Sequence, residues 1–148
     1  MRLFLFLLFA FVASAVPRSE AADRRYLLPI TQALETPEAK EKLDGSVKFI
    51  FGRNDKPRLG SKVLRTELVP GKFHTYSRAM EEVCSAAFVR ALAILNTRAK
   101  RVKGDAVVDI VSSFKGHPEF SSMTEFECYQ GAAITSVTLR GDIVNLND

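Results

Sequence analysis

The chain has 148 residues, of which 47% are hydrophobic and 26% charged, and its formal net charge at neutral pH is +4. This length corresponds to one domain with a modest hydrophobic core. A net charge this small permits attraction to anionic surfaces, but it does not indicate a nucleic-acid-binding protein.

The first 21 residues have the pattern of a secretory signal peptide. Arg2 precedes an apolar run of about fourteen residues, which is shorter than the roughly 20 residues that cross a bilayer. Small-x-small cleavage patterns end at Ala15 and Ala21, and we prefer Ala21; a signal anchor that is never cut is the alternative. We therefore expect the mature chain, 22–148, to lack a transmembrane segment and to be periplasmic or secreted. Its net charge is 19 basic minus 16 acidic residues, or +3.

A short helix is expected near the start of the mature chain. Thr36 provides a hydroxyl cap and Pro37 suits the first helical position, while Gly45 ends the helix. Pro70-Gly71 is expected to break the chain again. Between these points we expect, in order, a strand over 46–52, a polar loop over 53–62 and a shorter strand over 62–69.

The longest predicted element is a helix that begins after Ser77 and stops at Gly104. Acidic residues near its start and basic residues near its end agree with the helix macrodipole. Apolar residues recur along it at steps of three and four, which predicts one buried stripe. The stripe consists of Met80, Cys84, Ala87, Phe88, Ala91, Leu95, Ala99 and Val102.

The last third of the chain is strand-like. A strand is expected over 105–114, a loop over 115–122, and then 123–130 and 132–144 as two strands or as one strand bent at Gly131. The predicted fold class is α+β. It consists of a small, mostly antiparallel sheet with the long helix packed across one face and the short helix before it. Residues 22–148 form a single domain.

Two pairs of residues could carry chemistry. Asp105 and Asp109 lie four apart on a predicted strand, hence on one face, where paired carboxylates could do acid–base work. Nothing else gathers around them, so we expect Asp105 to shape a turn and Asp109 to face solvent. His74 and His117 lie in polar loops, and the sequence around them lacks the four paired ligands of a structural zinc site. A weak copper or zinc site formed by His117 and Glu119 is the alternative. No catalytic residue, metal or cofactor is predicted.

A basic segment surrounds Arg53, Lys56 and Arg58. Its glycine spacing does not match a phosphate-binding loop. It also lacks the stacking aromatics of nucleic-acid sites. We expect a solvated loop, with contact to anionic lipid headgroups or cell-wall polymer as the functional alternative.

The two cysteines are both expected to point inward. Cys84 lies on the buried stripe, and Cys128 shares a strand face with Phe126, whereas Glu127 and Tyr129 lie on the other face. A catalytic thiol needs a nearby base and partial exposure, and the sequence shows neither. Because inward cysteines usually pair in an oxidising compartment, we expect a Cys84–Cys128 disulfide. Two free core cysteines are the alternative.

A cysteine on a long helix, followed by KGDAVVDI, FECYQG and SVTLRG, resembles the small domain of the RcsF-like envelope-stress sensor lipoproteins and the related YbjQ-like family. The resemblance covers residues 77–144. It places Gly104, Asp105, Ala106, Val107 and Val108 in a turn and strand, Gly131 after the second cysteine, and Cys84 and Cys128 in one disulfide. The sensor lipoproteins have a second disulfide and a lipid anchor, and this sequence has no cysteines for either.

This resemblance and the missing catalytic set favour a non-enzymatic periplasmic binding or interaction module with a role in envelope stress. Its partner would be an unknown envelope protein or surface. The alternative is a small metal- or ligand-binding homo-oligomer of the YbjQ-like type. The whole chain is also similar to small exported bacterial proteins of unassigned function. Some of those carry an excinuclease label, which the missing phosphate-binding loop contradicts.

Overall fold

The computed structural model describes residues 23–53, 62–76 and 78–146. The expected signal peptide, Lys56, Arg58 and the expected cap Ser77 lie outside the described residues. The elements in chain order are β1 (Arg24–Pro29), α1 (Ile30–Leu34), α2 (Pro37–Lys42), β2 (Lys48–Phe51), β3 (Val63–His74), α3 (Met80–Arg101), β4 (Ala106–Ser112), β5 (Glu125–Gln130) and β6 (Ile134–Val144).

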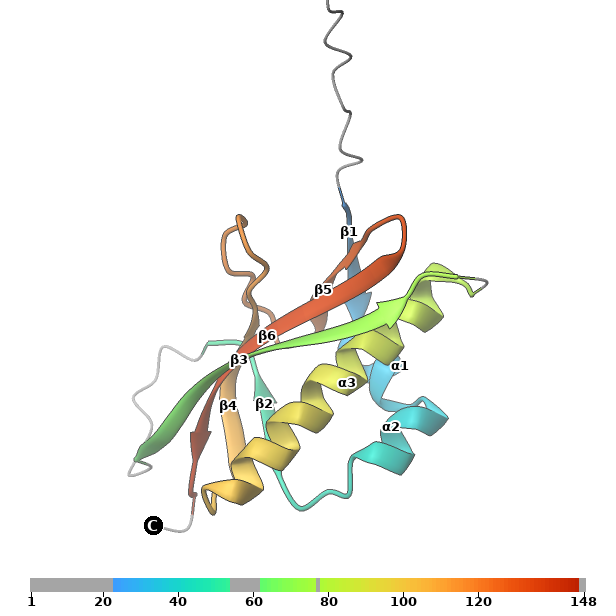
Figure 1. The fold of residues 1–148 in the computed structure, drawn as a ribbon. Helices are drawn as coiled ribbons and strands as arrows, with labels where there is room; N and C mark the ends of the chain where they lie inside the picture. Colours follow the sequence, from blue (N-terminus) through green and yellow to red (C-terminus); the bar gives the residue numbers. More distant parts are fainter. Residues whose placement is uncertain (1–22, 54–61, 77, 147–148) are drawn as a thin grey trace, which may run out of the picture.

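Strand β6 is the centre of the sheet. Strand β3 pairs along one of its sides, while β5 and β4 pair in succession along the other. Each of these two strands has a further neighbour, β1 beside β5 and β2 beside β4. The sheet curls around α3, which lies in its concave face (Figure 1).

The α+β class and the single long helix are confirmed, but the expected small, mostly antiparallel sheet is not. The sheet has six strands and is mixed, because β2 runs parallel to β4. A parallel pair needs a long crossover connection, and here that connection contains β3 and α3. The sequence analysis also missed β1 and α1. The expected short helix is α2, which Thr36 caps by accepting a hydrogen bond from the Ala39 amide at 3.2 Å.

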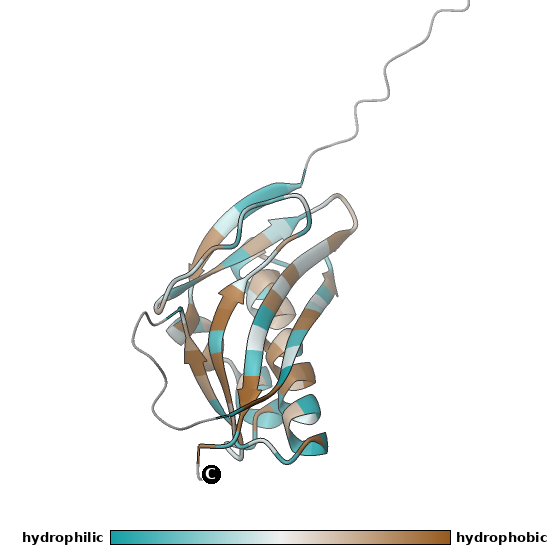
Figure 2. Ribbon diagram, turned by 90° about the vertical axis from the view of Figure 1, so that its left-hand side faces the viewer, coloured by the Kyte–Doolittle hydropathy of each residue, from teal (hydrophilic) through white to brown (hydrophobic). Residues whose placement is uncertain are grey.

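The predicted stripe of α3 forms the core. Its central members are fully buried, and Met80 and Val102 pack against them from the two ends. Phe88 stacks on Phe126 of β5 with ring centroids 4.1 Å apart, and it contacts Phe51 of β2 at 5.8 Å. Hydrophobic stretches run through the strands and through the helix behind them (Figure 2).

The end of α3 differs from the prediction in its detail. The left-handed residue that terminates the helix is Lys103, with φ of 59°, and not Gly104. The Gly104 amide donates to the Ala99 carbonyl at 2.9 Å and the Lys103 amide to the Lys100 carbonyl at 3.1 Å, the two bonds of a Schellman motif. Glycine is needed at 104 for space, since a Cβ there would lie 2.4 Å from Cγ2 of Ile143.

The expected break at Pro70-Gly71 is wrong, since β3 continues through both residues. Pro70 stands opposite Thr138 and Gly71 opposite Val137 in the ladder with β6. In the described part of the sheet β3 pairs with β6 alone, and proline is tolerated in such an edge strand. Gly71 lies where β3 crosses the backbone of α3 at Ala87. The proline–glycine pair therefore serves close packing of a strand against a helix.

The connection between α2 and β2 is fastened to α3 by Asp44. Its carboxylate accepts a hydrogen bond from Lys100 Nζ, and it accepts two from Ser46, from the hydroxyl at 2.6 Å and from the amide at 3.1 Å. These contacts, with Lys100 first, hold the pKa of Asp44 well below its usual range. Because the pKa of Asp44 is lower in the folded protein than in the unfolded chain, the ionised carboxylate stabilises the fold at pH values above the unfolded-state pKa. This stabilisation is lost as the pH falls toward the folded-state pKa.

Asp44→Asn should therefore lower the melting temperature at neutral pH. The difference from the parent should shrink as the pH falls below about 4, where the unfolded carboxyl begins to take up its proton. Thermal unfolding across an acid pH series checks this. Lys100→Gln should give a similar loss at neutral pH. A deficit in Asp44→Asn that does not change with pH would assign the effect to the shape of the amide and not to the carboxylate charge.

Candidate functional site

The candidate site lies on the convex face of β5, opposite α3. As the alternation predicted, Phe126 and Cys128 face the helix while Glu127 and Tyr129 point the other way. Those two outward residues are nevertheless buried, with exposed fractions of 3% and 2%. The connection from β4 to β5, residues 113–124, covers them. Reciprocal backbone hydrogen bonds of 2.9 Å between Ser112 and Phe120 hold it in place.

Aromatic residues of this connection bury the ring of Tyr129. Phe114 stacks on it, with centroids 3.9 Å apart and ring planes 10° apart. The His117 ring lies 4.8 Å away in a tilted arrangement. Stacked and tilted ring pairs of this kind add to the free energy of burial. The connection is therefore packed against the sheet by Tyr129 itself.

An ion pair between the exposed Arg25 and the buried Glu127 lies beside the tyrosine. Arg25 on β1 stands opposite Tyr129 in the strand register, and its Nε and Nη2 atoms each lie 2.6 Å from Oε1 of Glu127. This hydrogen bond is the main cause that raises the pKa of Arg25 above its ordinary value. The guanidinium also lies 5.6 Å from the ring centroid of Phe120. The amide of Glu127 donates to Ser112 Oγ at 2.9 Å.

Two buried oxygen atoms of the site make no direct hydrogen bond of ordinary geometry among the described residues, although Tyr129 lies close enough to Arg25 and Glu127 to interact with both. These atoms are Oε2 of Glu127 and the hydroxyl of Tyr129. Burial, and then the charge of Glu127, raises the pKa of Tyr129, so the phenol keeps its proton at neutral pH and can donate it. A buried polar group left without a partner costs about 1–3 kcal/mol. Two such groups side by side call for an explanation.

Both residues line one cavity. Its volume is about 370 Å³, and its walls are Arg25, His117, Pro118, Glu119, Phe120, Glu127 and Tyr129. Cavities of this size lie at the lower end of the range used for small ligands. The cavity offers a carboxylate acceptor, a hydroxyl, guanidinium donors and flat aromatic walls. Such a set can hold a small polar molecule by hydrogen bonds on one side and ring contacts on the other.

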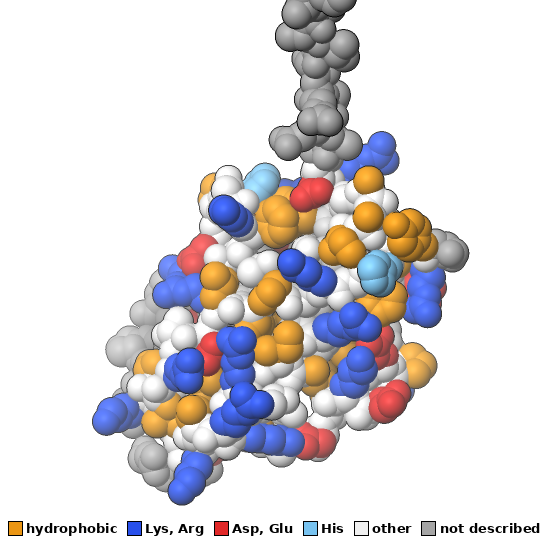
Figure 3. Space-filling model, in the orientation of Figure 1, with side chains coloured by type: hydrophobic (Ala, Val, Ile, Leu, Met, Phe, Trp, Pro, Cys, Tyr) orange, Lys and Arg blue, Asp and Glu red, His pale blue; other side chains and the backbone are white. Residues whose placement is uncertain are grey.

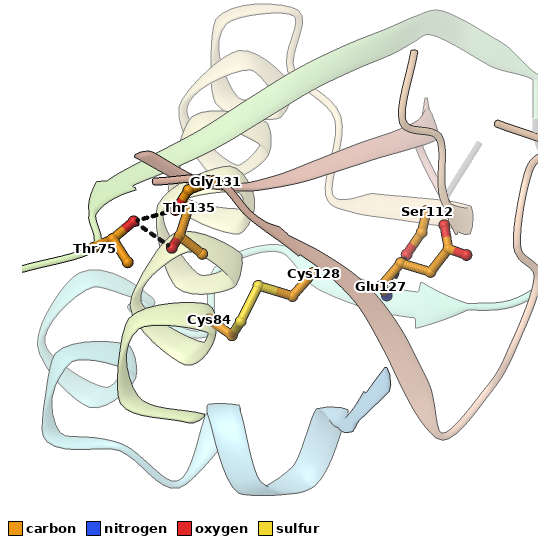
Figure 4. The surroundings of a disulfide bond; sticks show 7 residues. All are labelled: Thr75, Cys84, Ser112, Glu127, Cys128, Gly131 and Thr135. Carbon is orange, nitrogen blue, oxygen red and sulfur yellow. Dashed lines mark hydrogen bonds between the residues drawn. A yellow bond between two sulfur atoms is a disulfide. The ribbon is translucent and has the colours of Figure 1, made fainter. Parts of the chain in front are cut away.

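The disulfide fixes the strand that carries the site. Cys84 of α3 and Cys128 of β5 are bonded, and their Cα atoms lie 5.8 Å apart, within the usual range for a disulfide. Figure 4 shows the bridge between helix and strand, with Glu127 directed toward Ser112. Since Cys128 stands between Glu127 and Tyr129 in the chain, the bridge holds both site residues against the core.

The residues that the resemblance placed in a turn and strand lie in the connection after α3 and at the start of β4. The carbonyl of Asp105 accepts from the Lys48 amide at 2.9 Å, and its carboxylate accepts from the Leu146 amide at 2.8 Å. Ala106, Val107 and Val108 follow as buried residues of β4. Gly104, described above, leads into this turn.

Gly131 lies in the turn between β5 and β6, which are two strands and not one bent strand. Its amide donates to the Ile134 carbonyl at 2.9 Å. Its carbonyl accepts from the Thr75 hydroxyl at 3.3 Å, and Thr75 also shares a 3.1 Å hydrogen bond with Thr135 (Figure 4). The glycine is therefore part of the link between the β5–β6 turn and the end of β3.

The two candidate pairs are not assembled into sites. Asp109 has a positive φ of 50° at a bulge in β4, which interrupts the alternation expected to place Asp105 and Asp109 on one face. His74 stacks with Tyr76 at 6.1 Å, while His117 lines the cavity described above. Among the residues that the structure describes, no three His, Cys, Asp or Glu side chains are grouped so as to hold a metal ion.

Arg53 is the one member of the predicted anionic-surface contact that the structure describes, because Lys56 and Arg58 lie outside the described residues. Its guanidinium pairs with Glu119. Arg140 also pairs with Glu119, at 3.2 Å. Arg53 therefore helps to hold the connection that covers the cavity.

The sequence analysis did not identify Arg25, Glu127 or Tyr129 as a site. A usable signal was present, since the polar connection before β5 carries Phe114, His117 and Phe120. Aromatic residues in a polar loop indicate that the loop packs on a surface. The alternation of β5 shows that this surface includes Glu127 and Tyr129.

None of the helices in 23–53, 62–76 and 78–146 has the length and apolar character needed to cross a membrane. The buried disulfide is compatible with an exported protein. No family model, curated protein or solved structure matches the chain.

Proposed function

We propose that the protein is a non-enzymatic binding module of the cell envelope, which holds a small polar ligand in the cavity over β5. The observation that carries this proposal is the cavity over β5, whose lining includes Glu127 and Tyr129, each with a buried oxygen that makes no direct hydrogen bond among the described residues. The signal-peptide pattern and the disulfide support a periplasmic or secreted location.

The chemistry of the walls favours a neutral ligand that carries hydroxyl or amide groups. Oε2 of Glu127 can only accept, so the ligand must present an O–H or N–H to it. The hydroxyl of Tyr129 can donate to a ligand oxygen. Arg25 already balances the charge of Glu127, so the site does not need a charged ligand. Aromatic walls suit the apolar face of a sugar ring, and a saccharide group meets all of these requirements.

Binding is favoured over catalysis by the same contacts. Arg25 already engages the carboxylate of Glu127 through Oε1. The raised pKa of Tyr129 keeps the phenol protonated. A general base must be within reach of a proton and poised to take it near the working pH. The phenol is not poised in this way, and the paired carboxylate and the phenol are both suited to hold a ligand.

Tyr129→Phe separates ligand binding from folding. Removal of a buried hydroxyl that makes no direct hydrogen bond should leave the free energy of unfolding unchanged or raise it by about 1 kcal/mol. The same change should weaken a bound saccharide about tenfold, because one hydrogen bond to the ligand is lost. Calorimetry or chemical denaturation measures the first effect. NMR titration with glucose and N-acetylglucosamine, followed at the amides of 113–130, measures the second.

Tyr26→Phe is the matched control, since Tyr26 lies on the neighbouring strand and packs toward the core. It should leave saccharide affinity unchanged. Equal affinity of the parent and Tyr129→Phe would contradict the proposed role of the hydroxyl. The absence of shifts in the cavity amides with either sugar, at the highest soluble concentrations, would contradict a saccharide ligand.

A further inference from the structure

A second hollow surface lies along the outer face of α3 and reaches β3 at one end, away from the cavity over β5. It consists of two adjoining depressions that share Arg98 and Arg101. The larger, about 630 Å³, is lined by Arg90, Ala93, Ile94, Thr97, Arg98 and Arg101. The smaller, about 270 Å³, is lined by Arg65, Glu67, Arg98, Arg101 and Val102. We call the two together the arginine groove.

The arginine groove carries a net positive charge. Its lining contains four arginines and one acid, Glu67, which gives a formal charge of +3. Glu67 is buried and pairs with two of the arginines, with Arg98 and, at 2.7 Å, with Arg65. The guanidiniums of Arg90 and Arg101 have no carboxylate partner among the described residues, so their charge is available to a ligand.

The groove follows one face of α3. Arg90, Ile94, Thr97 and Arg101 recur at steps of three and four, hence on one stripe about 16 Å long. Arg90 is held at one end, because it donates to the Lys72 carbonyl at 2.9 Å and lies 4.5 Å from the ring centroid of Phe73. Figure 3 shows Lys and Arg side chains spread over this face, with hydrophobic side chains between them.

The groove is rich in hydrogen-bond donors and poor in available acceptors. Arg65 and Arg98 occupy the Glu67 carboxylate, and Arg90 contacts the Lys72 carbonyl. The Thr97 hydroxyl donates to the Ala93 carbonyl at 3.1 Å. A peptide backbone presents as many donors as acceptors, and most of its N–H groups would find no partner here. A phosphate group in its ionised form presents acceptors only, and arginine binds it in a bidentate manner.

We propose that the arginine groove binds the phosphate headgroups of an anionic phospholipid surface. The guanidiniums of Arg90 and Arg101, which pair with no carboxylate among the described residues, would contact the phosphates. Ala93 and Ile94, both half-buried between them, would lie against the apolar part of the lipid. This site is independent of the saccharide cavity and of the Arg53 segment, since it shares no residue with either.

The test uses the mature chain and vesicles of phosphatidylglycerol mixed with phosphatidylcholine. The variant Arg90→Ser/Arg101→Ser removes two charges without touching the Arg98–Glu67 pair. Each arginine close to an anionic leaflet should contribute about a fivefold gain in partition, so the double variant should bind roughly 30-fold more weakly. Binding of the parent should also fall as salt is raised.

Lys40→Ser/Lys115→Ser is the matched control, because it removes the same charge from exposed positions outside the groove. It should bind the vesicles nearly as well as the parent. If both double variants lose the same amount, binding depends only on net charge and the proposal is wrong. Equal binding by the parent and the arginine variant would overturn it too.

Two further arms separate other occupants of the groove. Tighter binding of polyglutamate than of the anionic vesicles would make the groove a site for an acidic protein segment and overturn the lipid assignment. Saturation of the groove amides by inorganic phosphate, with no preference for anionic over zwitterionic vesicles, would do the same in favour of a soluble anion. Should the double variant fail to fold, Arg101→Ser alone serves, and a loss of about fivefold is expected.

Discussion

Removal of the Cys84–Cys128 disulfide should lower the free energy of unfolding by about 4 kcal/mol. The two cysteines are 44 residues apart, and the chain-entropy model gives about that value for a loop of this length. The effect is a large part of the roughly 5–15 kcal/mol that stabilises a typical domain. Chemical denaturation of Cys84→Ala/Cys128→Ala against the oxidised parent measures it.

The choice of replacement separates the bridge from its surroundings. Both cysteines are fully buried in the main core cluster, so Cys84→Ser/Cys128→Ser should be less stable than the alanine pair, because it buries two hydroxyls in an apolar setting. Reduction of the parent under denaturing conditions should yield two titratable thiols. Two titratable thiols in the exported protein before reduction would contradict the bridge.

Periodicity predicted the parts of the fold in which one residue pattern decides one contact surface. The stripe of α3 follows from the spacing of its apolar residues, and every member lies in the core or packs against it. The inward direction of Phe126 and Cys128 follows from simple alternation in β5. Because both cysteines lie on such patterned surfaces, their meeting could be predicted without knowledge of the sheet order.

Pairing between distant strands could not be predicted in the same way. The parallel partner of β2 is β4, which lies beyond β3 and α3 in the chain, and no local pattern records that choice. Strand β1 was missed because its exposed residues alternate only weakly with buried ones. The candidate cavity depends on the second of these failures, since Arg25 comes from β1.

Glycine illustrates the same limit at single positions. In the sequence, Pro70-Gly71 looks like a turn. The glycine is explained only by the close approach of β3 to α3, a helix that begins nine residues later in the chain. An ideal Cβ at this position would lie 1.8 Å from the carbonyl oxygen of Ala87 and 2.7 Å from the amide nitrogen of Ala91. Both atoms belong to the backbone of α3, which cannot yield in the way that a flexible side chain can.

Gly71→Ala should therefore cost more than about 3 kcal/mol, at or beyond the upper end of the usual range for overpacking. A single methyl group would force β3 away from α3, which also carries Cys84 and most of the core. Chemical denaturation of the variant, or its yield of folded protein if it is too unstable to measure, gives the result.

Gly45→Ala separates this packing effect from the cost of glycine's backbone freedom. Gly45 has a positive φ of 74°, yet nothing lies within 4 Å of the place where its Cβ would be. Alanine there meets only the strain of the left-handed conformation, about 1–2 kcal/mol. Gly71 has no positive φ, so its loss on substitution must come from contact with α3. A smaller loss at Gly71 than at Gly45 would show that strand and helix can separate at little cost, and that the glycine in β3 is not what sets their distance.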